Sequence, residues 1–276
     1  MAVTPALTLV ILGAGVVAGA FGATLGLGGG IFLVPFLNLV IGLPITVAAA
    51  ISLTTVIATS SSVSAARAGH RLINLRLGMA LEVATALGSL GGGITAQLLS
   101  EDTIRRLFAV MMAIIALLML RTLNQRVTIP GTSVDPGVLG GRFDDPQSGG
   151  VVSYRVKRLP LALFMSFIAG NVSSLLGIGR GVIKVPVLNA WCDIPLRAAA
   201  ATSAFMIGVT ATAGAIIYYG NGQLMPVFAA AAVLGVLAGS WLGLRIGERA
   251  SNRALKIVMA TVMIVVAVIM AVRGRA

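Results

Sequence analysis

Two segments of this chain combine a run of glycines with the start of an apolar stretch. Residues 26–38 read GLGGGIFLVPFLN, and residues 177–189 read GIGRGVIKVPVLN. Glycine lets the backbone turn without a side-chain clash, and it lets a ligand come close to the amide groups. A helix that begins after such a run points its unpaired N–H groups at the break, where they attract anions. The two segments therefore predict a binding site for one small anion, although small residues of this kind also serve in close helix packing.

The second segment adds two cations to this pattern. Arg180 stands where the first segment has Gly29, and Lys184 stands where it has Leu33. A helix would present residues four apart on one face, and the planar arginine fork can hold two oxygens of a sulfonate or carboxylate. A charge inside a bilayer is unfavourable unless it faces a cavity or a partner, which makes both cations candidates for substrate binding. The alternative is that both side chains extend to the cytoplasmic headgroups.

Glu82 is the acidic residue that lies well inside a predicted membrane span. It follows Arg76 by six residues, which places it about 9 Å along a helix and still near the cytoplasmic interface. Two interpretations stay open: the carboxylate carries a coupling proton, or it simply reaches the headgroups. Lys184 could pair with this carboxylate when no substrate is bound.

The expected site draws on both halves of the chain. The candidate substrate-binding residues are Gly26, Gly28, Gly29, Gly30, Ser52, Gly177, Gly179, Arg180, Gly181, Lys184 and Ser203. The two serines are included because they occupy matching positions just beyond the glycine segments. Structural roles, capping the short helix or holding a turn, are expected for the residues that close the segments. These residues are Pro35, Asn38, Pro186 and Asn189.

The glycine segments belong to a longer internal repeat. Each residue of the first copy corresponds to the residue 151 positions later, as Gly26 does to Gly177, and this register holds without a gap beyond the segments. Because Gly, Pro and Asn do not coincide by chance over such a length, the chain is predicted to contain two copies of one membrane unit. These copies are residues 1–123 and 159–276, joined by a connector over residues 124–158.

The composition is that of a helical membrane protein. Hydrophobic residues make up 58% of the chain and charged residues 10%, whereas soluble domains carry about 25% charged residues. Apolar runs, most of them long enough to cross the hydrocarbon core, cover 6–25, 44–66, 77–99, 107–120, 159–176, 198–218, 224–244 and 257–272. The N-terminus lacks the basic stretch of a signal peptide, so no cleavage is expected.

The residue types argue against several other functions. The net charge of +12 comes from basic residues at the ends of apolar runs, as the positive-inside rule requires, and not from one patch that would bind nucleic acid. One cysteine, Cys192, excludes internal disulfides, and one histidine, His70, leaves no Cys/His metal site or haem ligand pair. Nucleophile–base triads, carboxylate pairs and nucleotide-binding motifs are absent from the sequence. The chain is therefore not expected to be an enzyme or to need a cofactor or metal.

The distribution of charges predicts opposite orientations for the two halves. The basic loop of the first half is 67–76, but its counterpart at 220–223 is uncharged, and the second half is basic at 245–256 instead. If basic loops are cytoplasmic, each half crosses the membrane an odd number of times. Three full spans leave an even number of crossings for the glycine segment, and both termini lie outside. A parallel arrangement would place 245–256 outside, against the charge rule.

These inferences define an all-α polytopic membrane protein. It has two inverted-topology repeats, each made of a glycine-broken hairpin or short helix pair plus three transmembrane helices. Residues 124–158, rich in Gly, Pro and Asp, are expected to form a solvated cytoplasmic connector. The connection 190–197 is expected on the same side, where labelling of the Cys192 thiol would report the orientation.

The duplicated motif, with the Ala-Ala-Ala-x-Ser that follows it, resembles the paired motif of the sulfite exporter TauE/SafE permeases. The similarity covers nearly the whole chain except the connector. It implies a secondary transporter, often an exporter, for small sulfur-containing or organic anions. The glycines and prolines of that motif correspond to Gly26, Gly28, Gly30, Pro35, Gly177, Gly179, Gly181 and Pro186, whereas Arg180 departs from the more usual glycine.

The leading hypothesis is therefore an ion-coupled secondary transporter of a prokaryotic inner membrane, with alternating access around the two glycine breaks. Its expected partners are a small anion such as sulfite or a sulfonate, a coupling ion such as H+, and the lipid bilayer, with a homo-oligomer as a further option. The alternative is a membrane scaffold or assembly factor without transport activity, with residues 124–158 as its docking element.

Overall fold

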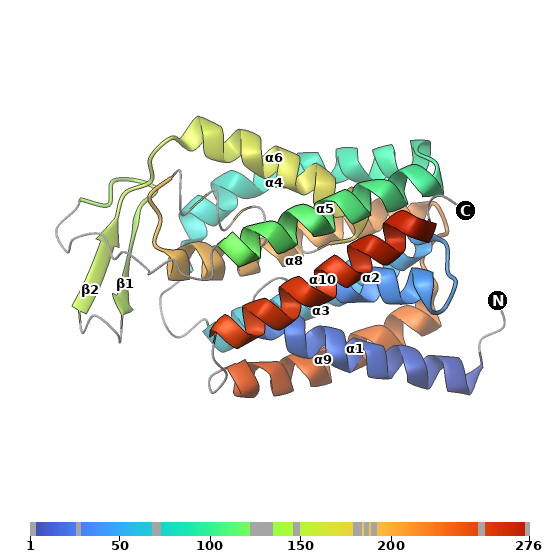
Figure 1. The fold of residues 1–276 in the computed structure, drawn as a ribbon. Coiled ribbons are helices and arrows are strands. Elements are labelled where there is room, and N and C mark those ends of the chain that lie inside the picture. The colour runs from blue at the N-terminus through green and yellow to red at the C-terminus, as the bar shows by residue number, and fades with distance from the viewer. Residues whose placement is uncertain are drawn as a thin grey trace.

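The structure is a computed structural model that describes residues 4–25, 29–67, 73–121, 135–145, 150–178, 184, 188, 192–247 and 252–273. The helices of the first half are α1 (Pro5–Leu25), α2 (Gly30–Leu39), α3 (Ile45–Arg67), α4 (Leu75–Leu98) and α5 (Glu101–Arg121). Those of the second half are α6 (Leu159–Leu176), α8 (Leu196–Gly220), α9 (Pro226–Gly247) and α10 (Asn252–Arg273). Between the halves, β1 (Gly141–Asp145) and β2 (Gly150–Tyr154) form an antiparallel pair. The start of α1 and the end of α10 lie at one end of the molecule, and the strands lie at the other (Figure 1).

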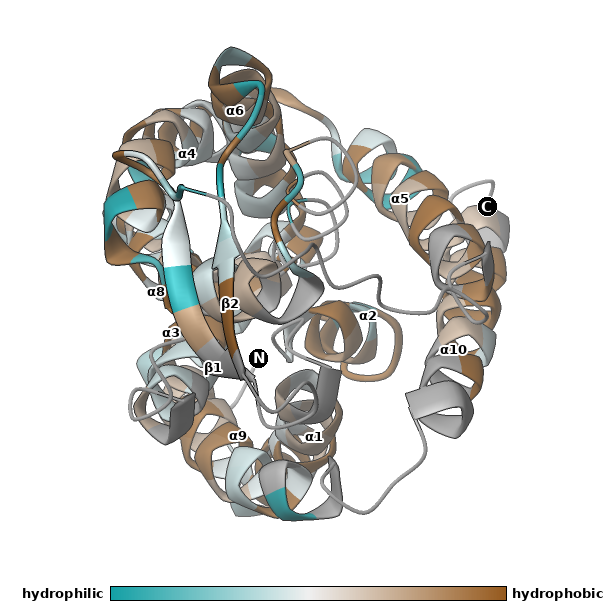
Figure 2. Ribbon diagram, turned by 90° about the vertical axis from the view of Figure 1, so that its left-hand side faces the viewer, coloured by the Kyte–Doolittle hydropathy of each residue, from teal (hydrophilic) through white to brown (hydrophobic). Residues whose placement is uncertain are grey.

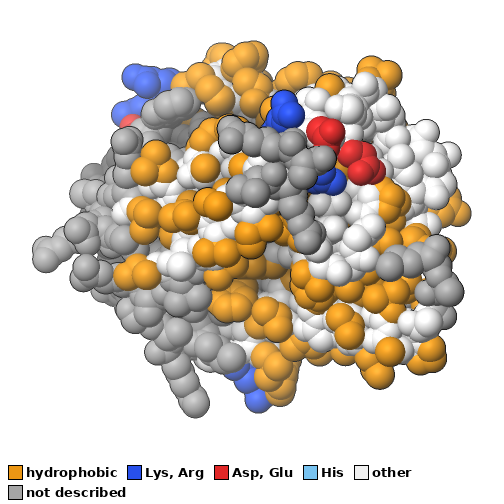
Figure 3. Space-filling view, turned by 45° about the vertical axis from the view of Figure 1, so that its right-hand side comes forward, with side chains coloured by type: hydrophobic (Ala, Val, Ile, Leu, Met, Phe, Trp, Pro, Cys, Tyr) orange, Lys and Arg blue, Asp and Glu red, His pale blue; other side chains and the backbone are white. Residues whose placement is uncertain are grey.

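Six of the described helices are long and apolar enough to cross a membrane, namely α1, α3, α4, α6, α8 and α9. Within the same described residues, α2 and the second half of α10 are apolar but shorter. Hydrophobic side chains cover much of the surface, while charged side chains gather in a few places (Figure 3). Large apolar residues such as Leu9 and Leu98 are exposed, an arrangement that lipid tails accept and water does not. The prediction of a helical polytopic membrane protein is confirmed.

The first glycine run is followed by a short helix at the centre of the fold. α1 ends at Leu25 and α2 begins at Gly30, so the run falls between them. With 10 residues, α2 is about 15 Å long, half the thickness of the hydrocarbon core. Seen along the helices, α2 is surrounded by the longer ones (Figure 2). The helix that the sequence predicts after the break is therefore a central element.

The helices pack in pairs that repeat between the two halves. α1 packs on α9, and their counterparts in the repeat, α6 and α4, pack on each other. α3 packs on α8, and α5 packs on α10, so each of these contacts joins a helix to its own counterpart. α4 also packs on α8, just as α9 packs on α3. This pattern is what a two-fold relation between the halves produces.

Glycines bring two of these helix pairs unusually close together. A Cβ atom at Gly88 of α4 would collide with the carbonyl oxygen of Phe167 on α6. At the matching place, a Cβ atom at Gly239 of α9 would collide with the carbonyl oxygen of Val16 on α1. The same relation recurs one turn later at Gly92 with Asn171 and at Gly243 with Ala20. Because a carbonyl of one helix takes the place of a side chain on the other, only glycine allows this approach.

The order of the contacts gives the direction of the helices. Along α4 and α6, and likewise along α1 and α9, the contacting residue numbers rise together, so each pair is parallel. Gly78 of α4 faces Thr202 of α8, and further along Gly93 faces Ile217, so α4 and α8 are parallel as well. The short connection 221–225 reverses the chain between α8 and α9. α1 therefore runs opposite to its counterpart α6, and α4 runs opposite to α9.

The connector contains a β-hairpin that is not simply solvated, which corrects the expectation from its composition. Three of its side chains, Phe143, Val152 and Tyr154, are buried against residues of α4, α6, α8 and the connection before α8. The side-chain nitrogen of Asn74, the N-cap residue of α4, donates to the Leu139 carbonyl at 2.8 Å and to the Tyr154 hydroxyl at 3.1 Å. A small strand pair is thus joined to an otherwise helical fold.

Gly88→Ala is expected to lower the free energy of unfolding by about 1–3 kcal/mol, because the added methyl group overpacks the contact between α4 and α6. Gly91→Ala, on the same helix, is the matched control. Its methyl group would lie 3.4 Å from the Asn171 side-chain nitrogen, an ordinary contact, and alanine favours the helix. Thermal unfolding of the purified proteins in detergent makes the comparison, and equal melting temperatures for the two variants would contradict the close approach.

Candidate functional site

The two glycine segments meet inside the molecule. A Cβ atom at Gly30, the first residue of α2, would lie 2.5 Å from both the Gly177 carbonyl oxygen and the Ser52 hydroxyl oxygen. The Ser52 hydroxyl on α3 donates a 2.6 Å hydrogen bond to that carbonyl and is fully buried. The start of α2 from the first half and the end of α6 from the second half therefore share one place.

Gly177 occupies a position that only glycine fits. It ends α6 with a φ angle of +67°, and its N–H donates to the Ser173 carbonyl. Side-chain-bearing residues rarely adopt this left-handed conformation. A Cβ atom here would also come within 2.7 Å of the Ala49 Cα atom on α3. Backbone geometry and lack of space together explain the break after α6.

Several residues that the sequence assigns to the glycine segments lie outside the described residues. They are Gly26, Gly28, Gly179, Arg180, Gly181, Pro186 and Asn189. Gly29 is described and buried, and its carbonyl accepts the N–H groups of Phe32 and Leu33 at the start of α2. Pro35 lies within α2 and is buried there. Of the two glycine segments, the structure therefore describes residues 29–38, 177–178, 184 and 188.

Lys184 is buried among the helices, with 2% of its surface exposed. Its ammonium donates a 2.7 Å hydrogen bond to the Thr85 hydroxyl on α4 and lies 3.9 Å from the Met206 sulfur on α8. The alternative interpretation required this side chain to extend to the headgroups, but in this structure it lies between helices. A buried ammonium needs polar partners, and the hydroxyl of Thr85 supplies one.

Glu82 borders the same contact between α4 and α8. One of its carboxylate oxygens, Oε1, accepts a hydrogen bond from the Thr210 hydroxyl. The Met206 carbonyl oxygen, 3.1 Å from the same hydroxyl, is a second acceptor. Thr85 follows Glu82 by three residues, so both lie on the face of α4 that meets α8. We refer to this group as the polar seam: Glu82, Thr85, Lys184, Met206 and Thr210.

Ser203 matches Ser52 in the repeat, but its contacts differ. Its side chain is fully buried, and its hydroxyl has no hydrogen-bond partner among the described residues. The residue that corresponds to Gly177 in the repeat is Gly26, which lies outside the described residues. The structure therefore shows a contact between Ser52 and Gly177. Within the described residues, Ser203 makes no hydrogen bond to another candidate substrate-binding residue.

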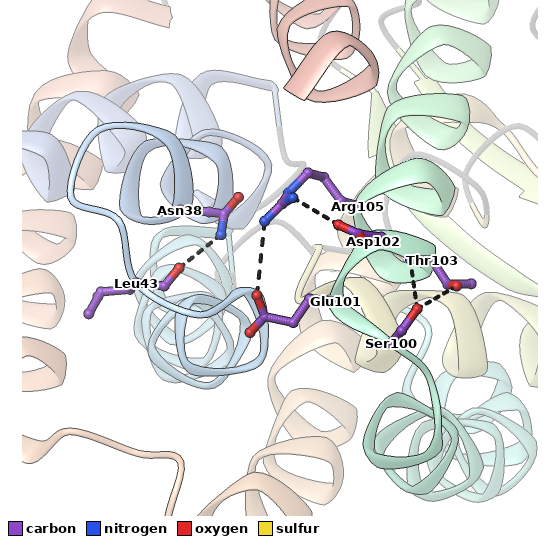
Figure 4. A network of polar contacts seen from close by, with 7 residues as sticks. All are labelled: Asn38, Leu43, Ser100, Glu101, Asp102, Thr103 and Arg105. Carbon is purple, nitrogen blue, oxygen red and sulfur yellow. Dashed lines mark hydrogen bonds and ion pairs between the residues drawn. The ribbon is translucent and has the colours of Figure 1, made fainter. Parts of the chain in front are cut away.

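Asn38 holds the turn between α2 and α3, one of the two roles that the sequence indicates for it. Its side chain donates to the Leu43 carbonyl at 2.8 Å (Figure 4). Near the same end of the molecule, Arg105 on α5 pairs with Asp102 at 3.2 Å and with Glu101 at 3.9 Å. Both acidic partners are half exposed or more, so these pairs stabilise the protein little. They lie on a different helix from the polar seam.

The β-hairpin covers the connection before α8. Cys192 in this connection is fully buried. The backbone N–H of Lys157 donates to the Cys192 carbonyl at 3.2 Å, and its ammonium pairs with Asp193 at 2.9 Å. Burial raises the pKa of the Cys192 thiol, and the negative charge of Asp193 raises this pKa further. The positive charge of Arg158 lowers it by less. A buried thiol of raised pKa reacts slowly, so Cys192 is not the accessible marker of orientation that its place in the sequence indicated.

Thr85, Met206 and Thr210 are the residues of the polar seam that the sequence analysis missed. The available signal was helical spacing, since Thr85 follows Glu82 by three residues and Met206 precedes Thr210 by four. Spacing identifies the shared face of a helix but not the partner that packs on it. Over the described residues, no group of three or more His, Cys, Asp or Glu side chains could hold a metal ion, and the ammonium and hydroxyl groups of the seam suit an anion instead.

Comparisons with known proteins agree with a membrane function. A family model described as sulfite exporter TauE/SafE matches residues 11–270, a range that includes both glycine segments and the polar seam. Over 245 residues the chain is 29% identical to the probable membrane transporter protein YunE of Bacillus subtilis (strain 168), which covers 86% of this chain and 87% of that protein. No solved structure matches the chain.

Ser52→Ala is expected to lower the free energy of unfolding by about 1–3 kcal/mol, because it leaves the buried Gly177 carbonyl without its donor. Ser203→Ala is the matched control, since it removes a hydroxyl that has no partner among the described residues, and it should be neutral or slightly stabilising. The melting temperatures of the two purified variants test this difference. A greater loss of stability at Ser203 would show that the Ser52 bond is not what holds the two segments together.

Proposed function

Because the chain belongs to the TauE/SafE sulfite exporter family, we propose that it is a secondary transporter that exports a small sulfur-containing or organic anion. The observation that carries this proposal is the ammonium of Lys184, buried within a membrane protein and held by the Thr85 hydroxyl. A cation at such a place is unfavourable unless it serves a partner. An anionic substrate is the partner that the family and the chemistry of the site have in common.

Recognition of the anion combines charge with backbone amides. Lys184 supplies a compact point charge. The start of α2 at Gly30 adds N–H groups and the positive end of the helix dipole, next to the Gly177 carbonyl. This set of donors suits sulfite, sulfonates, thiosulfate or carboxylates.

Transport proceeds by alternating access around the two glycine breaks. The proposal includes two inverted repeats, residues 1–123 and 159–276, in the inner membrane of a prokaryote with both termini outside. The opposite directions of α1 and α6 support it, as does the contact of Gly30 and Ser52 with Gly177 across the two halves. This contact places the two glycine breaks at one shared site.

A membrane scaffold without transport activity is the alternative function. Its docking element would be residues 124–158, but the apolar side chains of the β-hairpin in that segment are buried against the protein's own helices. A thermal-shift screen with sulfite, sulfonates, thiosulfate and carboxylates separates the two functions. A ligand that binds the folded state raises the melting temperature, whereas a scaffold shows no such shift.

Lys184→Gln is expected to weaken anion binding by about 1.5–3 kcal/mol, the contribution of a hydrogen bond to a charged group. Lys157→Gln is the control, because it removes an ammonium that is exposed and paired with Asp193. Binding of sulfite and of isethionate to both purified variants is measured by calorimetry. Dissociation constants equal to those of the wild type in a folded Lys184→Gln protein would remove this residue from the site.

The proposed orientation is tested with single cysteines in a Cys192→Ser background. Val138, just before β1, and Asn221, after α8, are both exposed. In intact cells an impermeant maleimide should label Asn221→Cys, whereas Val138→Cys should react only after permeabilisation. The reverse pattern would place the connector outside and contradict the orientation.

A further inference from the structure

The polar seam joins the two halves, and the repeat gives it an apolar counterpart. The residues that correspond to Glu82, Thr85 and Lys184 in the repeat are, in the same order, Val233, Val236 and Leu33. Leu33 and Val236 are fully buried, so the fold fills the equivalent place with hydrocarbon. The charges of the seam are therefore not required to complete the fold.

Two charges at such a place require a functional explanation. Apolar residues of similar volume in place of a buried pair of charges are often neutral or stabilising, and ionised groups within the membrane are unfavourable. Across the six candidate membrane spans, Glu82 is the only acidic residue and Arg76 the only basic one. Glu82 precedes Thr85, the partner of the buried Lys184 ammonium, by three residues on α4.

We propose that Glu82 and Lys184 form a proton-coupled anion site that carries one proton and one monovalent anion in the same direction. This inference rests on the proposed function and names its coupling ion. In the loading step a proton bonds to the Glu82 carboxylate, which becomes a neutral carboxylic acid, and the anion binds at the Lys184 ammonium. On the other side of the membrane both species leave, and the carboxylate is restored. Because an electroneutral symporter follows the sum of the two gradients, export through this site requires an outward anion gradient that exceeds the inward proton gradient.

The sum of charges explains why the two species move together. The empty site holds an ammonium and a carboxylate, and the loaded site holds an ammonium, a neutral acid and an anion, so both are neutral overall. A site with only the proton carries a net positive charge, and a site with only the anion carries a net negative charge. A net charge is unfavourable in apolar surroundings, so only the empty and the fully loaded forms reorient. Exchange of a proton against the anion would require a charged form and is therefore disfavoured.

The hydrogen bonds of the seam permit this protonation. The Thr210 hydroxyl donates to the carboxylate of Glu82, and the Met206 carbonyl lies within 3.1 Å as a second acceptor. When Glu82 takes up a proton, the hydroxyl can turn to that carbonyl and keep a hydrogen bond. Lys184 keeps the Thr85 hydroxyl throughout. In both states the threonine hydroxyls therefore keep a hydrogen-bond partner. A buried hydroxyl without one would make that state less stable.

Few other charged groups lie on the elements around Glu82. α4 packs mainly on α6 and α8, and α6 contains no acidic or basic residue. Arg76 is exposed near the start of α4, and Arg197 belongs to the first turn of α8. Tyr218 is at the far end of α8, where its hydroxyl donates to the Ser174 carbonyl. Lys184 is thus the charged group that shares the seam with Glu82.

The test uses the purified protein in liposomes with isethionate, a sulfonate whose single charge does not change near neutral pH. A gradient of one pH unit, acidic outside, should drive inward accumulation of isethionate about tenfold at equilibrium for a one-to-one symporter. Glu82→Gln should abolish this accumulation while exchange of labelled for unlabelled isethionate persists, because the amide imitates the protonated acid. Glu101→Gln, the same change at a half-exposed site, should accumulate isethionate as the wild type does.

A second measurement does not depend on transport. Isethionate binding to the wild type should weaken as the pH rises, whereas binding to Glu82→Gln should not change with pH, and Lys184→Gln should bind weakly throughout. Accumulation by Glu82→Gln, or binding with the same pH dependence as the wild type, would overturn the coupling and leave the transporter intact. Absence of both binding and exchange in the wild type would instead count against the proposed function.

Discussion

Close approach between backbones is the constraint on which this structure depends. At Gly88 and Gly239 a carbonyl group of one helix lies where the neighbour would carry a side chain, and Gly30 makes the same kind of contact with Gly177. Within a bilayer the hydrophobic effect does not drive helices together, so association depends on packing and polar contacts at short range. Glycine provides both, because it removes the side chain and exposes the backbone dipoles to the neighbouring helix.

The same close contacts determine where the polar groups can lie. When α4, α6 and α8 approach this closely, little space remains between them, and the side chains of the seam other than the partly buried Glu82 are buried. Thr85 and Thr210 are fully buried for this reason, and their hydroxyls are oriented toward Lys184 and Glu82. A hydroxyl that is fixed by packing binds a charged group with less loss of entropy than a mobile one. Tight packing thus produces the preformed polar environment that a buried ammonium needs.

The two halves share an architecture but not a chemistry. Equivalent helices pack in equivalent ways, yet the positions that correspond to Lys184 and Thr85 hold Leu33 and Val236. The β-hairpin is likewise one-sided, since it covers the connection before α8 and lies between the halves in sequence. A repeated scaffold can therefore carry charged side chains at one place and apolar side chains at the place that corresponds to it.

Properties that depend on local composition and on register can be predicted from the amino-acid sequence. Hydropathy predicts the membrane helices, the glycine runs predict the breaks, and comparison of the copies identifies Lys184 as the cation that replaces Leu33. Contacts between distant segments are seen in the folded chain alone. Two examples are the hydrogen bond from the Lys184 ammonium to Thr85 and the close approach of Gly30 to Gly177. A third example is the packing of the β-hairpin against Cys192. Periodicity shows which face of a helix is apolar and which is polar. It does not show which residue lies across a contact, because that depends on packing between segments about a hundred positions apart.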